Sequence, residues 1–228
     1  MPYFYFDYSY LVLIPAMIFA LVAQAMVSSA FNKYNNVRTG CSMTGADAAR
    51  LILDRNGLHH VKIEQIAGNL TDHFDPRTNV IRLSGAVYGS TGIAAVGVAA
   101  HEAGHAVQYA EGYGPMKLRS AIIPVTNIGS KLALPIFIIG LLFSYEIAMF
   151  GIILFSLTAV FQAVTLPVEF NASRRAMEAL DSSARLTSDE LRGARKVLSA
   201  AALTYVAALA SALSQILRLL IIANRRRD

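Results

Sequence analysis

The sequence predicts a mainly α-helical integral membrane protein with about four membrane helices and one small β-sheet. Of its 228 residues, 55% are hydrophobic and only 15% are charged, which is outside the usual range of soluble domains. The mean hydropathy of +0.46 agrees with this fold class. Four apolar segments have about the length that a helix needs to cross a hydrocarbon layer of roughly 30 Å; they begin near Tyr10, Ala121, Ala148 and Val197.

The first apolar segment, residues 10–31, is expected to be an uncleaved anchor. No charged residue lies between Asp7 and Lys33. Residues 23–25 (Ala-Gln-Ala) resemble a signal-peptide cleavage site, but a signal peptide begins with basic residues, and this segment is preceded by Asp7 without Lys or Arg. Aromatic residues at its start are typical of a membrane interface; they are Tyr3, Phe4, Tyr5, Phe6, Tyr8 and Tyr10.

Basic residues after the anchor predict its orientation. Loops rich in Lys and Arg stay in the cytoplasm, and Lys33, Arg38, Arg50 and Arg55 follow the anchor. We therefore expect the N-terminus outside and residues 32–118 in the cytoplasm. The lone Cys41 agrees with a reducing compartment.

Residues 44–83 are expected to form a short helix and a small sheet. Residues 44–47 are typical of a helix start, and Asn56-Gly57 is typical of a helix end. Three segments, 61–66, 69–74 and 79–83, predict strands. An exposed edge of this sheet could bind an extended peptide, or the sheet could be an ordinary scaffold; the sequence favours neither.

The most informative motif is His-Glu-Ala-Gly-His at positions 101–105. It lies in a run without proline, 93–110, that is rich in Ala and Val and is followed by glycine and proline, so we expect a helix. On a helix, His101 and His105 lie one turn apart on one face, as two zinc ligands do, and Glu102 between them can act as a general base. The alternative is a buried helix whose histidines only form hydrogen bonds. Burying two imidazoles without partners would be costly, which favours the metal.

The second apolar region is expected to be a transmembrane hairpin. Residues 121–143 lead out, residues 144–146 turn without basic charge, and residues 148–168 return. Lys131 lies in the outgoing segment, where an ammonium group is costly. Either Lys131 has a partner, or the hairpin enters the bilayer only from Leu132.

A catalytic zinc ion takes three protein ligands, so one is expected outside the motif. Glu169 is the best placed, because it begins a helical run, 169–176, where the hairpin returns to the membrane edge. Its alternative role is an ion pair with Arg174 or Arg175. The other candidates are His59, His60, His73, Glu178 and Asp181.

The last apolar segment, residues 197–217, is expected to span the membrane, although it could instead lie in the interface. A span leaves the basic tail, Arg225 to Arg227, outside and against the charge rule, whereas an interfacial helix keeps it near anionic lipid. Juxtamembrane basic residues account for the net charge of +5. No motif indicates nucleic-acid binding.

Several motifs together resemble one family, the bacterial YugP-type membrane zinc metallopeptidases, and more distantly the HtpX and CAAX prenyl protease gluzincins. They lie at residues 70–76, 81–84, 99–108, 166–173 and 202–205. The resemblance implies a gluzincin-like zinc peptidase core in a bacterial plasma membrane. It also implies that His101, His105 and Glu169 bind zinc and that Glu102 is the catalytic base. One departure is Ser173, where the distant gluzincins carry an Asp that orients a ligand histidine; Asn171 or Asp181 could replace it.

We therefore expect a multi-pass metalloendopeptidase that hydrolyses membrane or membrane-associated proteins on the cytoplasmic side. His73 and Tyr205 are candidate donors to the oxyanion. The alternative is a catalytically silent zinc-containing scaffold, and a membrane-protein partner or a second copy of the chain is possible for either. The expected parts are an anchor (1–31), a cytoplasmic peptidase part (32–118), a hairpin (119–168), a third-ligand helix with a cytoplasmic segment (169–196), and a C-terminal apolar helix with a basic tail (197–228).

Overall fold

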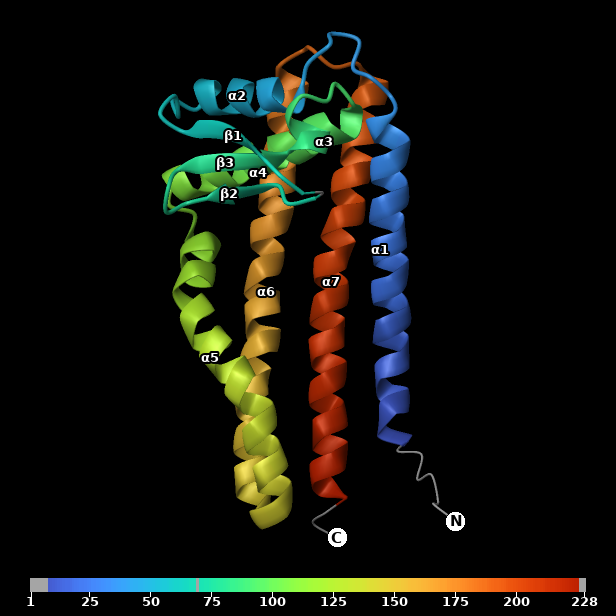
Figure 1. Ribbon diagram of the computed structural model, residues 1–228, viewed down its shortest axis with the longest axis vertical. Coiled ribbons are helices and arrows are strands. Elements are labelled where there is room, and N and C mark those ends of the chain that lie inside the picture. The colour runs from blue at the N-terminus through green and yellow to red at the C-terminus, as the bar shows by residue number, and fades with distance from the viewer. Residues whose placement is uncertain (1–7, 69, 226–228) are drawn as a thin grey trace. The chain divides into compact units, whose positions relative to one another are not determined.

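The computed structural model describes residues 8–68 and 70–225, which form two compact units. The helical unit contains the described residues up to Ala23, residues 118–166 and the described residues from Thr204 onward; the site unit contains residues 24–117 and 167–203. The chain is mainly helical with a single three-stranded sheet among its described residues (Figure 1), which confirms the predicted fold class. The aromatic residues at positions 3–6 and the basic residues at 226 and 227 lie outside the described part.

Among the described residues, four helical stretches are long and apolar enough to cross a membrane, as predicted. Large apolar side chains on them, such as Leu21, Ile128 and Phe143, expose more than half of their surface, which is favourable in lipid and unfavourable in water. The protein is therefore a membrane protein. The stretches are Tyr8–Asn35, which comprises η1 (Tyr8–Leu13) and α1 (Ile14–Asn35), then α5 (Gly114–Phe143), α6 (Tyr145–Ser182) and α7 (Ser188–Asn224).

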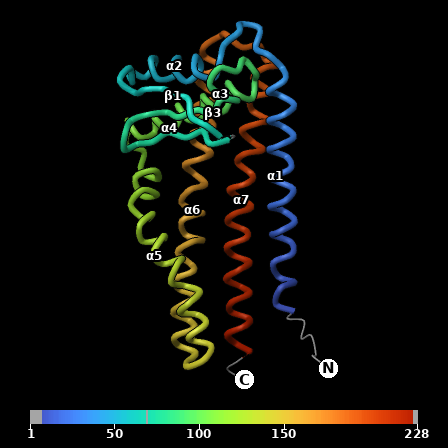
Figure 2. The backbone as a smooth tube through the Cα atoms, in the orientation of Figure 1, coloured from blue at the N-terminus to red at the C-terminus, as the bar shows by residue number. Residues whose placement is uncertain are grey.

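The predicted hairpin is present in the helical unit. Only Ser144 separates α5 from α6, and the two helices lie side by side next to this turn (Figure 2). A Cβ atom at Gly140 would lie 2.0 Å from the backbone nitrogen of Ala148, so glycine permits the close contact. Helix α5 is continuous through Lys131, whose side chain is exposed.

In the site unit, a short helix and the sheet come before the motif helix. Helix α2 (Gly45–Arg55) begins at a capping box in which Thr44 and Asp47 bind each other's backbone N–H groups. The sheet has the order β1-β3-β2: β1 (Lys62–Ile66) is parallel to β3 (Val80–Ser84), and β2 (His73–Asp75) is antiparallel to it. After the short helix α3 (Gly85–Tyr88), the motif helix α4 spans Ile93–Ala110, as the sequence predicted.

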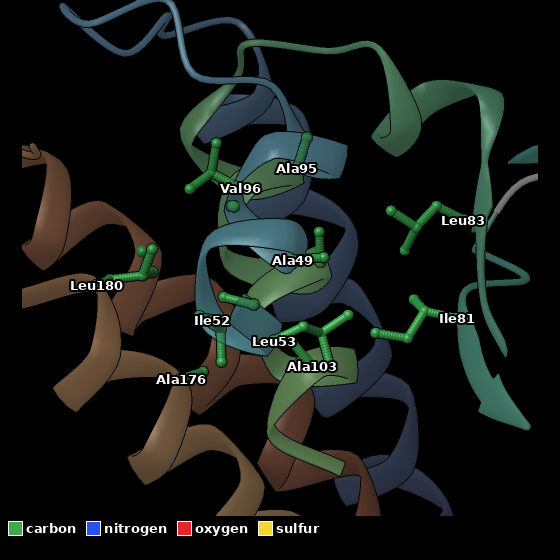
Figure 3. Packing of buried hydrophobic residues seen from close by; sticks show 14 of the residues in the cluster. Ala49, Ile52, Leu53, Ile81, Leu83, Ala95, Val96, Ala103, Ala176 and Leu180 are labelled. Atoms are coloured by element: carbon green, nitrogen blue, oxygen red, sulfur yellow. The ribbon is translucent and has the colours of Figure 1, made fainter. Parts of the chain in front are cut away.

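Helix α4 is the centre of the hydrophobic core of the site unit. Ala103 is fully buried, and most other residues of this helix are buried as well. Figure 3 shows side chains from α2, β3, α4 and α6 facing one another in this core. The small Ala side chains of α4 let these elements approach closely, so the backbone of the motif helix is held from several sides. The labelled residues are Ala49, Ile52, Leu53, Ile81, Leu83, Ala95, Val96, Ala103, Ala176 and Leu180.

Three expectations from the sequence need correction. The strand expected at 69–74 is only His73–Asp75, because Gly68 and Leu70 have positive φ angles of 108° and 56° and turn the chain before it; Asn69 is not described. Glu169 does not begin a helix, since α6 continues through Pro167; an apolar surrounding strongly favours the helical backbone even where proline removes one hydrogen bond. The last helix, α7, is longer at both ends than the expected 197–217.

Candidate metal centre

Three side chains from two helices meet in the site unit: His101 and His105 from α4, and Glu169 from α6. Their potential ligand atoms all lie within 4.8 Å of one another. Nε2 of His101 is 3.2 Å, and Nε2 of His105 is 3.4 Å, from Oε2 of Glu169. The two imidazole rings stand edge to face with centroids 4.6 Å apart, because residues four apart lie one above the other on a helix.

The spacing of these atoms fits a tetrahedral zinc ion. Zinc–ligand bonds of about 2.0–2.1 Å place two ligand atoms of a tetrahedral site about 3.3 Å apart, close to the two distances that Glu169 makes. Two imidazoles and one carboxylate are also a donor set of catalytic zinc sites, which keep a fourth position open. These residues would hold the zinc ion, and their chemistry suits it.

The electrostatics of the site favour a cation. Burial opposes the charged form of His105, but its hydrogen bond to Glu169 and the nearby carboxylates of Glu102 and Glu169 raise its pKa above the ordinary value. Positive charge is therefore stabilised between the two histidines and Glu169, where the zinc ion would lie.

Each histidine is oriented by a neutral hydrogen-bond partner at Nδ1. The hydroxyl of Ser173 lies 3.0 Å from Nδ1 of His101. The position that carries Asp in the distant gluzincins therefore still contacts a ligand histidine, but without charge. Neither Asn171 nor Asp181 replaces it: Asn171 bonds to Gln108, and Asp181 is exposed. A carboxylate partner would make the histidine a stronger ligand. A histidine whose partner is a hydroxyl is therefore expected to bind the metal less tightly.

The orientation of His105 is determined by a chain of polar groups. Arg175 can only donate, and its Nε donates to Oδ1 of Asn171 at 2.7 Å. Gln108 donates from Nε2 to the same Oδ1 at 2.9 Å and to the Val168 carbonyl at 2.8 Å. The Oε1 of Gln108 therefore faces His105, 3.0 Å from Nδ1, and must accept. Nδ1 then carries the proton, and Nε2 is available for a metal.

An ion pair outside the site supports this chain of polar groups. Arg175 also pairs with Glu111 at 2.7 Å. The hydrogen bond from Arg175 lowers the pKa of the Glu111 carboxyl below its ordinary value, so the pair is charged near neutral pH. It anchors the guanidinium that orients Asn171.

Glu102 lies next to the two histidines and is held by the sheet. The backbone N–H of Phe74 in β2 donates to Oε2 of Glu102 at 3.0 Å. Strand β2 is an edge strand, and its other side pairs with β3. Because one oxygen is held by this bond, the side chain keeps one orientation, with the second oxygen available to another partner.

Close contact between α4 and α6 brings the candidate ligands together. A Cβ atom on Gly104 would lie 2.6 Å from the carbonyl oxygen of Ala172, so only glycine allows the observed separation. Gly104 lies beside the candidate ligand His105, and Ala172 lies one turn from Glu169. The packing role of Gly104 therefore also sets the distance between the candidate ligands on the two helices.

We expect Gly104→Ala to lower the free energy of unfolding by about 1–3 kcal/mol, as overpacked cores do, and to weaken zinc binding. Gly97→Ala is the matched control on the same helix, since its nearest contact would be an ordinary 3.5 Å to Ala194; it should be neutral or stabilising by up to about 1 kcal/mol. Thermal unfolding and zinc titration of both variants check this. Equal behaviour of the two variants would contradict it.

None of the other candidate residues belongs to the described cluster of His101, His105 and Glu169. His73 is exposed on β2, with Nδ1 2.8 Å from the Thr71 carbonyl. Tyr205 is half-buried in α7 and belongs to the helical unit. The alternative third ligands His59, His60, Glu178 and Asp181 are exposed, and none of them joins the described cluster of His101, His105 and Glu169.

Comparison with known proteins agrees with the geometry. The sequence model of a family described as "putative neutral zinc metallopeptidase" matches residues 9–224. The chain belongs to this family. A curated relative, the "putative membrane protease YugP" of Bacillus subtilis (strain 168), is 48% identical over 207 residues, or 90% of this chain and 92% of the relative. No solved structure matches the chain. The resemblance inferred from the motifs is thereby confirmed, together with zinc as the cofactor of the family.

Two contacts of the site were not predicted from the sequence. Gln108 follows His105 by three positions, a spacing that places two side chains on one helix face, so its role could have been inferred. The contact between Phe74 and Glu102 could not, because it uses a backbone N–H group and depends on how β2 docks against α4.

Proposed function

We propose that this protein is a zinc-dependent endopeptidase that hydrolyses membrane or membrane-associated proteins. The observation that supports this proposal best is the meeting of His101, His105 and Glu169 at zinc-ligand spacing, with Glu102 beside them. A metal site that only stabilises a scaffold has no need for Glu102. The ligand Glu169 lies in α6, directly after an apolar stretch of the same helix, which favours substrates at the bilayer.

In the proposed mechanism, a bound zinc ion would polarise the scissile carbonyl of the substrate and make a bound water molecule more acidic. Glu102 takes the proton from this water and passes it to the leaving amine. The N–H of Phe74 holds one oxygen of the Glu102 carboxylate, so the second oxygen would be left to accept the proton. Ser173 and Gln108 contact the two imidazoles at Nδ1, so both Nε2 atoms, which lie next to Glu169, would be left to hold the metal.

We further propose that the substrate lies extended along β2. The outer edge of this strand is the side that reaches Glu102, so a peptide along it would carry its scissile bond towards the zinc ligands. His73 on this strand is one candidate donor to the oxyanion. Its Nδ1 donates to the Thr71 carbonyl, so its Nε2 can donate only when the ring is protonated. Tyr205 is the second candidate.

The proposed activity can be tested by metal removal and restoration. The full-length protein in lipid nanodiscs is incubated with casein and with a set of single-pass membrane proteins, and mass spectrometry identifies new peptide termini. We expect cleavage by the zinc-loaded protein, loss of cleavage after chelation, and recovery on adding zinc. Absence of cleavage of every substrate by fully zinc-loaded protein would contradict the proposal and favour the scaffold.

We propose a topology with the N-terminus outside and the metal centre on the cytoplasmic side, with boundaries near residues 31, 118, 168 and 196. Basic residues following α1 support this orientation. The tail after α7 would then be outside.

The single cysteine offers a direct test of the topology. Cys41 is exposed and is the only cysteine of the chain. In intact cells, a membrane-impermeant maleimide should leave Cys41 unlabelled and label it after permeabilisation. Ser144→Cys in a Cys41→Ser background is the control, because the hairpin turn is expected outside and should be labelled in intact cells. The opposite pattern would invert the topology.

A further inference from the structure

The site unit contains a cavity whose lining includes neither a proposed zinc ligand nor Glu102. It has a volume of about 590 Å³ and lies between the parts of α6 and α7 that belong to this unit. This volume is within the range of roughly 300–1,000 Å³ that ligand-binding cavities have. Most of its lining is apolar; Phe170, Met177, Leu198, Ala202 and Leu203 contribute.

The two ends of the cavity differ in polarity. Helices α6 and α7 are consecutive and joined by a short turn after Ser182. Asp181 and Arg195 line its more polar end. Phe170 lines it about 16 Å from Asp181 along α6, and Leu203 about 12 Å from Arg195 along α7, towards the apolar stretches of both helices. Phe170 is half-exposed there. A charged end and an apolar end at this separation match a lipid molecule with its headgroup near the turn.

The charged end has a cation that can bind phosphate. Arg174 is already paired with Glu178 at 2.7 Å. Within the described part of the chain, no carboxylate forms an ion pair with Arg195, although this residue also lines the cavity. Its guanidinium can therefore form charge-assisted hydrogen bonds to a phosphodiester.

The cavity is separate from the reacting side of the metal centre. The cavity is not lined by any of the four described residues of the proposed metal site, which are His101, Glu102, His105 and Glu169. Ser173 does line it, but this hydroxyl contacts Nδ1 of His101, the ring nitrogen that faces away from Glu169. A substrate bond held at the zinc ligands would therefore not pass through this cavity.

We propose that this cavity binds a phospholipid of the bilayer, with an acyl chain between Phe170 and Leu203 and the phosphate on Arg195. The occupant then packs beside Ser173, the residue that orients His101. This inference goes beyond the proposed peptidase activity, and its readout is lipid binding, so the two can fail independently.

The test is a titration of delipidated full-length protein in detergent with phosphatidylglycerol, counted by native mass spectrometry. We expect one lipid per chain at the tightest site. Diacylglycerol should bind at least about tenfold more weakly, because a charged hydrogen bond is lost, and inorganic phosphate alone should not compete at equal concentration. Leu203→Trp should weaken binding of phosphatidylglycerol by more than about tenfold by filling the cavity. The exposed Leu213 of the same helix provides the matched control, Leu213→Trp, which should bind as wild type.

A second pair of variants keeps the test decisive if Leu203→Trp fails to fold. Arg195→Gln should weaken binding by about tenfold, whereas Arg192→Gln, on the same helix but not lining the cavity, should leave it unchanged. Equal binding by both Arg variants, equal binding by both Trp variants, or release of the lipid by a substrate peptide would overturn the proposal. The last result would assign the cavity to the substrate.

Discussion

Glu102→Gln is expected to lower the rate of peptide hydrolysis by about a thousandfold or more while zinc stays bound. A general base contributes typically 10²–10⁴ to the rate, and an amide cannot accept the proton of water. The amide oxygen of Gln can still accept the Phe74 N–H bond that Oε2 makes at 3.0 Å. The structure around the site should therefore survive the change, with an N–H donor facing the water instead of an acceptor.

The measurement compares hydrolysis rate and bound zinc in the same preparation. Glu64→Gln is a suitable control, because Glu64 is exposed on β1 and is not part of the metal centre. It should retain both activity and zinc. If Glu102→Gln hydrolyses peptides at the wild-type rate, Glu102 is not the base. If it loses zinc as well, the residue has a role in the metal site that the proposed mechanism does not give it.

Glu169→Ala is expected to weaken zinc binding by more than about a hundredfold. Loss of a residue that only hydrogen-bonds to a ligand already costs about 10–100-fold in metal affinity, and Glu169 is proposed to be a ligand itself. The side chain is almost fully buried and lies within 3.4 Å of both imidazoles. Without its negative charge, two histidines face a positive ion alone, and the site binds zinc weakly.

Competition with a zinc-sensitive chelating dye measures this affinity. Glu178→Gln is the control on the same helix, since Glu178 is exposed and paired with Arg174; its zinc affinity should match that of wild type. If Glu169→Ala bound zinc with wild-type affinity, another residue would have to be the third ligand. The same titration with substitutions at His59, His60, His73 and Asp181 would then find it.

The parts of the fold that the sequence predicted well are those with local causes. The motif helix ends where glycine and proline follow it, and α2 begins where Thr44 and Asp47 form a capping box. The four long apolar helices follow from length and composition alone. Each of these features is encoded within one segment of the chain.

The parts that were missed depend on contacts between distant segments or on backbone geometry. Strand β2 is short because Gly68 and Leu70 adopt positive φ angles, which residue preferences do not reveal for Leu. A helix was expected to begin at Glu169, yet α6 continues through Pro167 to this residue, because an apolar surrounding favours unbroken helix. The contact of Phe74 with Glu102 joins residues 28 positions apart, and no local pattern encodes it.

The distribution of the proposed ligands along the chain affects when the proposed hydrolysis could first occur. His101 and His105 precede the whole hairpin, and Glu169 follows it. A ribosome that has finished α5 has therefore made two of the proposed ligands but not the third. With His101, His105 and Glu169 as the ligands, a nascent chain has no complete zinc site until α6 has been synthesised. The protein would thus be inert during the early stages of its own biogenesis, and hydrolysis would begin only after the hairpin has been made.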